Sequence, residues 1–379
     1  MNAPLSARLG GIRMYAATPR DVQAVQQNFL AQLEELGLAG YAETAVAADA
    51  SGHAVRFRLR RGFAEQWAPD GDTTALCQRL DLDPPAQSRD LEREILLSML
   101  LGPVAFDFPS HDELAAAVRI RQNIVEGARR TALAFHTREA ERPADYWTYD
   151  EDRGFTVLPG KPLLTALQKA TQPEASGKLY SFSCYRATEY VVLLGIAQEL
   201  ASGNPDLFRQ LQRQWETRAI MSGQFHDVFL REYGSMSEPL PPKYYVPGDR
   251  LWFRNPDELS SDASGYEGSW VFYLGGGLFT NFWQRDKPYT LTAKCLELFH
   301  WRHATYRDGD GELRIDENIV EERVLASMQN PAEAEGIVRE MLRYREPKGQ
   351  YGNGGCIDTS REYPRWVCPG TADLVLPGR

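Results

Sequence analysis

A helix that is apolar on nearly every side stands out in the middle of this chain of 379 residues. It includes the run YVVLLGIA at residues 190–197, and Gly203 and Pro205 end it. A helix with apolar side chains all round has no face suited to water, so it lies in the centre of a domain. The sequence therefore predicts a buried helix that starts at or near Cys184 and around which the other elements pack.

Strand-like segments follow this helix. Residues 250–254 (RLWFR) precede a stop at Asn255-Pro256, and residues 270–274 and 278–282 lie on either side of three glycines. Two apolar runs joined by a glycine turn are typical of a hairpin. A central helix followed by such strands predicts an α+β fold in which the helix packs on an antiparallel sheet.

Three further helices are predicted from the spacing of their apolar residues, at 21–38, 109–135 and 317–345, the last with a break at Asn330-Pro331. At the start of the second, Ser110 and Glu113 have the spacing of a capping box, in which each side chain bonds the other's backbone N–H. The paired prolines Pro84-Pro85 indicate a linker, so an N-terminal unit is expected to end shortly after them.

Composition narrows the class of protein. The net charge of −10 argues against nucleic acid or an acidic membrane as the main partner. No apolar signal sequence begins the chain, and no run approaches the ~20 apolar residues of a membrane span. We therefore expect a cytoplasmic protein, with export by another route left open. Five scattered cysteines, without the spacing of a zinc site, predict free thiols and no metal.

Cys184 is the cysteine whose position suggests chemistry. In the first turn of a helix, unpaired backbone N–H groups and the helix dipole favour a thiolate over a thiol. Ser181 or Ser183 can serve as the N-cap of this helix. A free cysteine can equally be a small buried apolar residue. Position alone leaves both interpretations open, a nucleophile and a core residue.

Five segments of the chain occur in a characteristic order and spacing: GPVAFDFPSHDELAAAVRIRQNIVEGAR, YWTYDEDRGFTV, LYSFSCYRATEYVVLLG, PGDRLWFRNPDE and GYEGSWVFYLGGGLFTNFW. Together they resemble the bacterial spore-coat type of protein-glutamine γ-glutamyltransferase (transglutaminase), within the papain-like NlpC/P60 superfamily. The resemblance runs from about Leu91 to Val324. It implies a papain-like core with additions at both ends: an N-terminal α+β extension (1–89), a transglutaminase-like catalytic domain (90–330) and a helical and loop-rich tail (331–379).

The resemblance implies a cysteine-dependent acyl transfer. Cys184 falls on the nucleophile, so its thiolate would attack the carboxamide of a protein glutamine and expel ammonia. A lysine or other primary amine would then take the acyl group from the thioester and form an isopeptide cross-link, whereas water would give deamidation. The implied partners are proteins with accessible glutamine and lysine side chains, and this chemistry needs no cofactor.

Two positions depart from the family. The base at the start of the first hairpin strand is a glutamate in this transglutaminase type and a histidine in NlpC/P60 peptidases, but it is Ser269 here. The second carboxylate, directly before the cysteine, is Ser183. A serine does not act as a general base near neutral pH. The third position, on the return strand, is Asn281, which fits an orienting role.

Several alternatives for the base and the function stay open. Glu267, two residues before Ser269, is the leading substitute base, and His226 or Glu189 could serve from elsewhere. A protein without any substitute would be an inactive binding scaffold that kept the fold. A glutamine deamidase would share the thioester step. So would a cysteine amidase or peptidase, but that class predicts a histidine at position 269.

Aromatic residues gather on the elements expected around Cys184. Most of them should belong to the core, because a strand in such a layer buries one face. The remainder could line a hydrophobic tunnel that excludes water and so favours transfer to an amine. The candidates for substrate binding are Tyr180, Phe182, Trp252 and Trp270.

Overall fold

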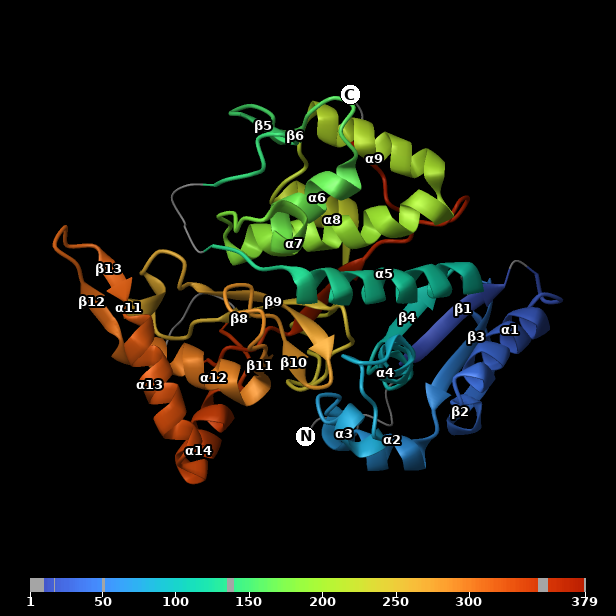
Figure 1. Ribbon diagram of the computed structural model, residues 1–379. Helices are drawn as coiled ribbons and strands as arrows, with labels where there is room; N and C mark the ends of the chain where they lie inside the picture. Colours follow the sequence, from blue (N-terminus) through green and yellow to red (C-terminus); the bar gives the residue numbers. More distant parts are fainter. Residues whose placement is uncertain (1–9, 17, 50–51, 135–139, 347–353, 378–379) are drawn as a thin grey trace.

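An antiparallel sheet of six strands occupies the middle of the structure (Figure 1). The computed structural model describes residues 10–16, 18–49, 52–134, 140–346 and 354–377. Along the sheet the strands are ordered β11-β10-β9-β8-β14-β7. Their bounds are β7 Leu230–Gly234, β8 Arg250–Arg254, β9 Gly268–Gly275, β10 Leu278–Phe279, β11 Tyr289–Thr290 and β14 Ser360–Pro364.

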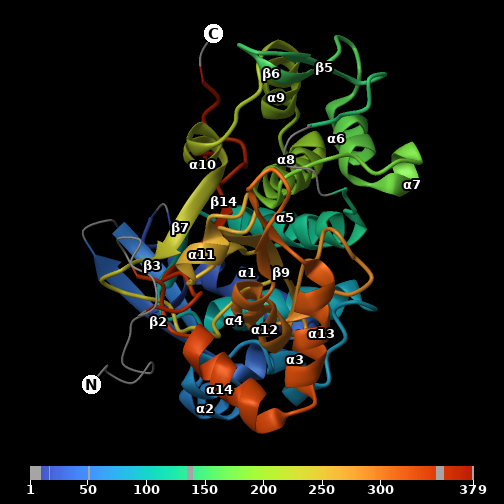
Figure 2. The ribbon, with the colours of Figure 1, turned by 90° about the vertical axis from the view of Figure 1, so that its left-hand side faces the viewer.

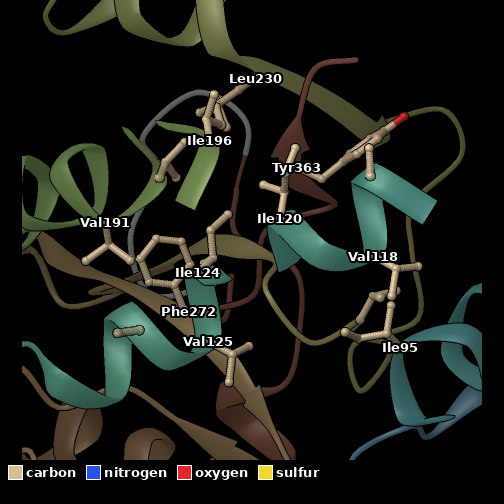
Figure 3. Packing of buried hydrophobic residues seen from close by; sticks show 14 of the residues in the cluster. Ile95, Val118, Ile120, Ile124, Val125, Val191, Ile196, Leu230, Phe272 and Tyr363 are labelled. Atoms are coloured by element: carbon tan, nitrogen blue, oxygen red, sulfur yellow. The ribbon is translucent and has the colours of Figure 1, made fainter. Parts of the chain in front are cut away.

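One face of this sheet packs on two long helices, α5 (His111–Arg130) and α8 (Cys184–Gly203). Strand side chains alternate between the two faces of a sheet. In β9, Phe272 points toward α5 and α8, and Figure 3 shows it close to Val191 of α8 and Ile124 of α5. This core extends to α6 (Leu163–Thr171) and α9 (Pro205–Thr217), which cover α8 on its other side.

The opposite face of the sheet packs on a second helical layer. Val271 and Tyr273, the neighbours of Phe272 in β9, belong to a separate apolar cluster on this side. The cluster is closed by α12 (Leu291–His300), α13 (Glu317–Met328) and α14 (Pro331–Met341), which Figure 2 shows grouped below β9. The six-stranded sheet is therefore sandwiched between two layers of helices.

A second sheet, of four strands, joins the N-terminal segment to the rest of the chain. Its order is β2-β3-β1-β4, and β1 pairs in parallel with β4. Helix α4 (Ser88–Leu100) precedes β4, so the boundary predicted near residue 89 falls inside a helix. The strands are β1 Gly11–Ala16, β2 Ala42–Asp49, β3 Gly52–Leu59 and β4 Ala105–Phe108, with α1 Val22–Glu35 packed against β1 and β3.

The remaining elements are short. The short α-helices are α2 Arg61–Trp67, α3 Leu76–Leu80, α7 Pro173–Ser176, α10 Gly223–Phe229 and α11 Glu258–Ser261. Two hairpins pair β5 Trp147–Asp150 with β6 Gly154–Val157, and β12 Thr305–Arg307 with β13 Leu313–Ile315. None of the helices in the described part of the chain combines the length and apolar composition needed to cross a bilayer.

The predicted start and end of the central helix are confirmed, at Cys184 and Gly203. Only one of the two hydrogen bonds of the predicted capping box at the start of α5 is present. Oγ of Ser110 accepts the backbone N–H of Glu113 at 3.2 Å. The Glu113 carboxylate instead accepts the backbone N–H of Cys368 at 2.7 Å and the hydroxyl of Thr371. The carboxylate therefore fixes the C-terminal tail rather than the helix start.

The return strand of the hairpin is shorter than predicted. β10 ends at Phe279, whereas the sequence predicted a strand to Phe282. Oδ1 of Asn281 accepts the backbone N–H groups of Trp283 and Gln284, at 3.3 and 3.1 Å. This local hydrogen bonding turns the chain out of the sheet, as asparagine side chains commonly do.

We predict that the contact between α5 and α8 depends on Gly195. A methyl group there would lie 2.7 Å from Cγ1 of Ile124 and 3.2 Å from its backbone nitrogen. Gly195→Ala should lower the free energy of unfolding by about 1–2 kcal/mol, because overpacking outweighs the ~1 kcal/mol gain in helix propensity. Urea denaturation measures this change.

Gly127→Ala on α5 is the matched control. A methyl group there meets Leu194 and Val191 at an ordinary 3.7 Å. This variant should be unchanged or up to about 1 kcal/mol more stable. Equal stabilisation by both alanines would contradict the account of the helix contact.

Candidate active site

The start of α8 presents Cys184 at the point where this helix meets β9. Oγ of Ser183 accepts the backbone N–H of Arg186 at 3.3 Å, so Ser183 is the N-cap. Such a cap satisfies one first-turn N–H and leaves others free to face a ligand. Ser183 thus has a structural role.

The charge state of Cys184 is set by opposing effects. Burial raises the pKa of its thiol above the ordinary value, and the Glu267 carboxylate adds to the rise. Backbone N–H groups of Trp270 and Tyr185 bond the sulfur and lower the pKa, as does the nearby ammonium of Lys294. Burial outweighs the rest, so the net effect is a raised pKa that favours the thiol form.

Cys184 opens into a cavity of about 520 Å³. Its walls come from the start of β9, the loop after β10, and the helices α12 and α13. Figure 2 shows α12 and α13 side by side. One part of the wall is apolar and is formed by side chains of α13: Val320, Val324, Leu325 and Met328.

Another part of the wall is polar and was not predicted. Lys294 of α12 is 3% exposed and forms an ion pair with Glu297 one turn later. The hydroxyl of Tyr289 donates to Glu297 at 2.7 Å. The hydroxyl of Tyr266 donates to Glu317 at 2.5 Å. Burial raises the pKa of the Glu317 carboxyl, so this group takes a proton more readily than an ordinary glutamate.

Stacked side chains support the cavity wall at Trp270 from the α8 side. The ring of Trp270 meets that of Tyr185 edge-on at 5.3 Å and stacks on Trp252 at 6.1 Å. The guanidinium of Arg250 lies 3.9 Å from the centre of the Trp270 ring. Nε of Arg250 donates to the hydroxyl of Thr188 at 2.7 Å. These contacts hold the start of β9 firmly against the start of α8.

Two further residues, Glu362 and His226, hold Arg250 in place. The carboxylate of Glu362 pairs with Arg250 and lies 2.9 Å from Nδ1 of His226. Burial of Glu362 opposes its ionisation, but these two partners outweigh it and hold the pKa of Glu362 below its usual value. The hydrogen bond to Glu362 raises the pKa of His226.

The predicted catalytic positions are placed as follows. Ser269 and Asn281 both line the cavity with Cys184. The side chain of Asn281 is committed to the turn after β10, because it also donates to the carbonyl of Lys287 at 3.2 Å. Glu267 is exposed and outside the cavity lining, and its carboxylate accepts the backbone N–H of Gly265.

The two other candidate bases lie away from the cavity. Glu189 is 1% exposed and is occupied by Arg186 and by the backbone N–H of Ser222. His226 is occupied by Glu362. Neither residue lines the cavity.

The predicted aromatic tunnel is only partly formed by the expected residues. Trp270 lines the cavity, but Tyr180, Phe182 and Trp252 do not. Phe182 is 2% exposed because the guanidinium of Arg142 covers its ring at 3.4 Å. Its place in the core, under a buried arginine, corrects the prediction that it contacts substrate.

Comparison with known proteins identifies the family of the chain. The chain belongs to the family of protein-glutamine gamma-glutamyltransferases, whose profile matches residues 73–374. Members of this family are cysteine-dependent acyltransferases that act on proteins. The match extends beyond the predicted limits of Leu91 and Val324 and includes most of the tail.

One solved structure is similar to part of this chain. It is a transglutaminase from Geobacillus stearothermophilus without its C-terminal extension, 21% identical in sequence, with a TM-score of 0.39. The similarity covers 57% of this chain and 98% of that one. No curated protein sequence gives a significant match.

We predict that His226 makes stability depend on pH. A histidine with a raised pKa in the folded state stabilises the fold below its unfolded pKa of ~6.5 and loses that effect as pH rises through the folded pKa. His226→Gln should remove this component. Urea midpoints measured from about pH 6 to 8.5 should fall with pH less steeply in the variant. Parallel curves would contradict the pairing with Glu362.

Proposed function

We propose that Cys184 forms a thioester with a protein glutamine and passes the acyl group to a primary amine. The observation that carries this proposal is the position of one cysteine. All five cysteines lie in the described residues, and Cys184 alone lines the cavity. It does so from the first turn of a buried helix, where a nucleophile is held rigidly and still reaches a substrate.

The reaction proceeds in two steps, acylation of Cys184 and transfer of the acyl group to the amine. The Cys184 thiol gives its proton to solvent, and the resulting thiolate attacks the glutamine carboxamide. A carbon–sulfur bond forms, and the carbonyl electrons move to oxygen. The carbon–nitrogen bond then breaks, and the nitrogen takes a proton from solvent and leaves as ammonia. The acceptor amine attacks the thioester, loses one proton as the amide bond forms, and releases the thiolate. Backbone N–H groups at the start of α8 are suited to hold the developing oxyanion.

The same geometry supports the papain-like assignment of the core. A cysteine at the N-terminus of a central helix, packed on an antiparallel sheet, is the arrangement expected of that class. We propose that the catalytic unit is larger than residues 90–330, because the tail supplies β14 to the same sheet.

Transfer to an amine is favoured over the other uses of a thioester. The apolar wall from α13 shields part of the cavity from water, which disfavours hydrolysis. No histidine lines the cavity among the described residues, and a peptidase of the NlpC/P60 type would need one as its base.

We predict that Cys184→Ala abolishes activity. Incorporation of a labelled primary amine into casein and release of ammonia should both fall to background, because the variant has no acyl carrier. Cys368→Ala is the control, since Cys368 is the other cysteine that is not fully buried, and it should retain both signals. Ammonia release without amine uptake would make the protein a deamidase. Equal activity in Cys184→Ala and the parent would contradict the proposal.

A separate prediction concerns Glu267. Its negative charge opposes the Cys184 thiolate, so Glu267→Gln should shift alkylation of Cys184 by iodoacetamide to lower pH. Amine transfer at neutral pH should be retained or increased. A loss on the order of 10²-fold or more in kcat/KM would instead identify Glu267 as the general base.

A further inference from the structure

Lys294 and Glu297 form a buried ion pair in the wall of the Cys184 cavity, and the steps above do not use it. Their side chains are 3% and 15% exposed. Removing a lysine ammonium from water costs several kcal/mol unless a partner compensates. A leucine or methionine at this position would pack without that cost. Packing alone therefore does not explain a lysine at position 294.

The ammonium of Lys294 is held in place from three sides. Glu297 pairs with it, and the hydroxyl of Tyr289 fixes Glu297 in turn. The Tyr289 ring lies 4.2 Å from Nζ and the Trp301 ring 5.9 Å from it, both within the range of a cation–π contact. Its position is therefore set by the fold rather than by solvent.

We propose that Lys294, positioned by Glu297 and Tyr289, is the fixed positive charge that stabilises the Cys184 thiolate. This inference rests on the proposed function. The thiolate is needed twice in each turnover, as the nucleophile toward glutamine and as the leaving group from the thioester. A cation in the wall of the cavity that Cys184 also lines favours both steps without accepting a proton.

Ser183 directly precedes Cys184, and Ser269 lines the same cavity; both side chains are uncharged. Carboxylates at Ser183 and Ser269 would place negative charge beside the sulfur and would compete with it for the ammonium. Burial raises the pKa of the Cys184 thiol, and the positive charge of Lys294 opposes that rise. Of the acidic groups near the sulfur, Glu267 acts in the opposite direction from its exposed loop.

Other charged groups face the cavity from α13 and the loop after β10. Burial raises the pKa of Glu317, and its hydrogen bond with Tyr266 and the charge of Lys294 oppose that rise. Lys287 stands at the rim, 71% exposed, with Nζ 4.0 Å from the carboxylate of Glu321. Lys287 is thus a second cavity lysine that differs from Lys294 in being solvated.

The test is the pH dependence of Cys184 alkylation by iodoacetamide, followed by mass spectrometry of the intact protein. A Cys368→Ala background removes the other accessible thiol. Lys294→Gln should shift the alkylation profile to higher pH, and Lys294→Arg should leave it near the parent. Lys287→Gln, which removes the same charge from a solvated position, should cause the smaller shift, because water screens exposed charges.

Activity gives the second readout. Lys294→Gln should lower kcat/KM for amine transfer on the order of 10²-fold, and Lys294→Arg should restore part of the loss. The double variant Lys294→Gln/Glu297→Gln replaces the ion pair by two amides of similar size, so it should keep the fold. Its alkylation profile should shift in the same direction but by less, because the negative charge of Glu297 is removed as well. Circular dichroism and urea denaturation check the fold of each variant.

Two results would overturn the inference. One is an alkylation profile that is unchanged in a folded Lys294→Gln or double variant. The other is an equal shift in Lys287→Gln, which would mean that net charge rather than Lys294 sets the profile. Alkylation does not require glutamine transfer, so failure of the proposed function would appear instead as an alkylated but inactive parent protein.

Discussion

The burial of α8 is the constraint on which the site depends. Its apolar side chains face α5 on one side and β9 on another, and Gly195 lets α5 approach closely. A helix buried all round does not slide or rotate without exposing apolar surface to water, at about 25 cal/mol for each Å². The first residue of the helix is therefore fixed in space. That residue is Cys184, which faces the start of β9 and the cavity beyond it.

Forming a thiolate at Cys184 costs free energy, because burial disfavours the charged form. The burial that fixes Cys184 also raises the pKa of its thiol. The residues nearest Cys184 include two uncharged serines, Ser183 directly before it and Ser269 in the lining of the same cavity. Ser183 caps α8, and Lys294 reaches the cavity from α12. Positive charge near the sulfur and hydrogen bonds from the backbone then offset part of the cost of burial.

Features with strong local signals could be predicted from the sequence. The all-round apolar pattern and its glycine and proline stop gave the bounds of α8, and the strand at 250–254 was equally plain. The polar wall could not be predicted, because Lys294 lies 110 residues from Cys184 and reaches the cavity only through packing of α12. The local indication of the polar wall is Lys294, which lies among apolar residues in the segment LTAKCLEL. Phe182 misled because it is close to Cys184 in sequence, while its ring turns inward beneath Arg142.

The acyl-enzyme itself is the most direct test of the account. The intact protein would be incubated with a short glutamine peptide in the absence of amine, quenched in acid, digested and examined by mass spectrometry. The account predicts an adduct of the peptide mass less ammonia on the fragment that contains Cys184, and its disappearance when a primary amine is added before the quench. An adduct on another cysteine, or none on Cys184 while the peptide is being deamidated, would contradict the central claim.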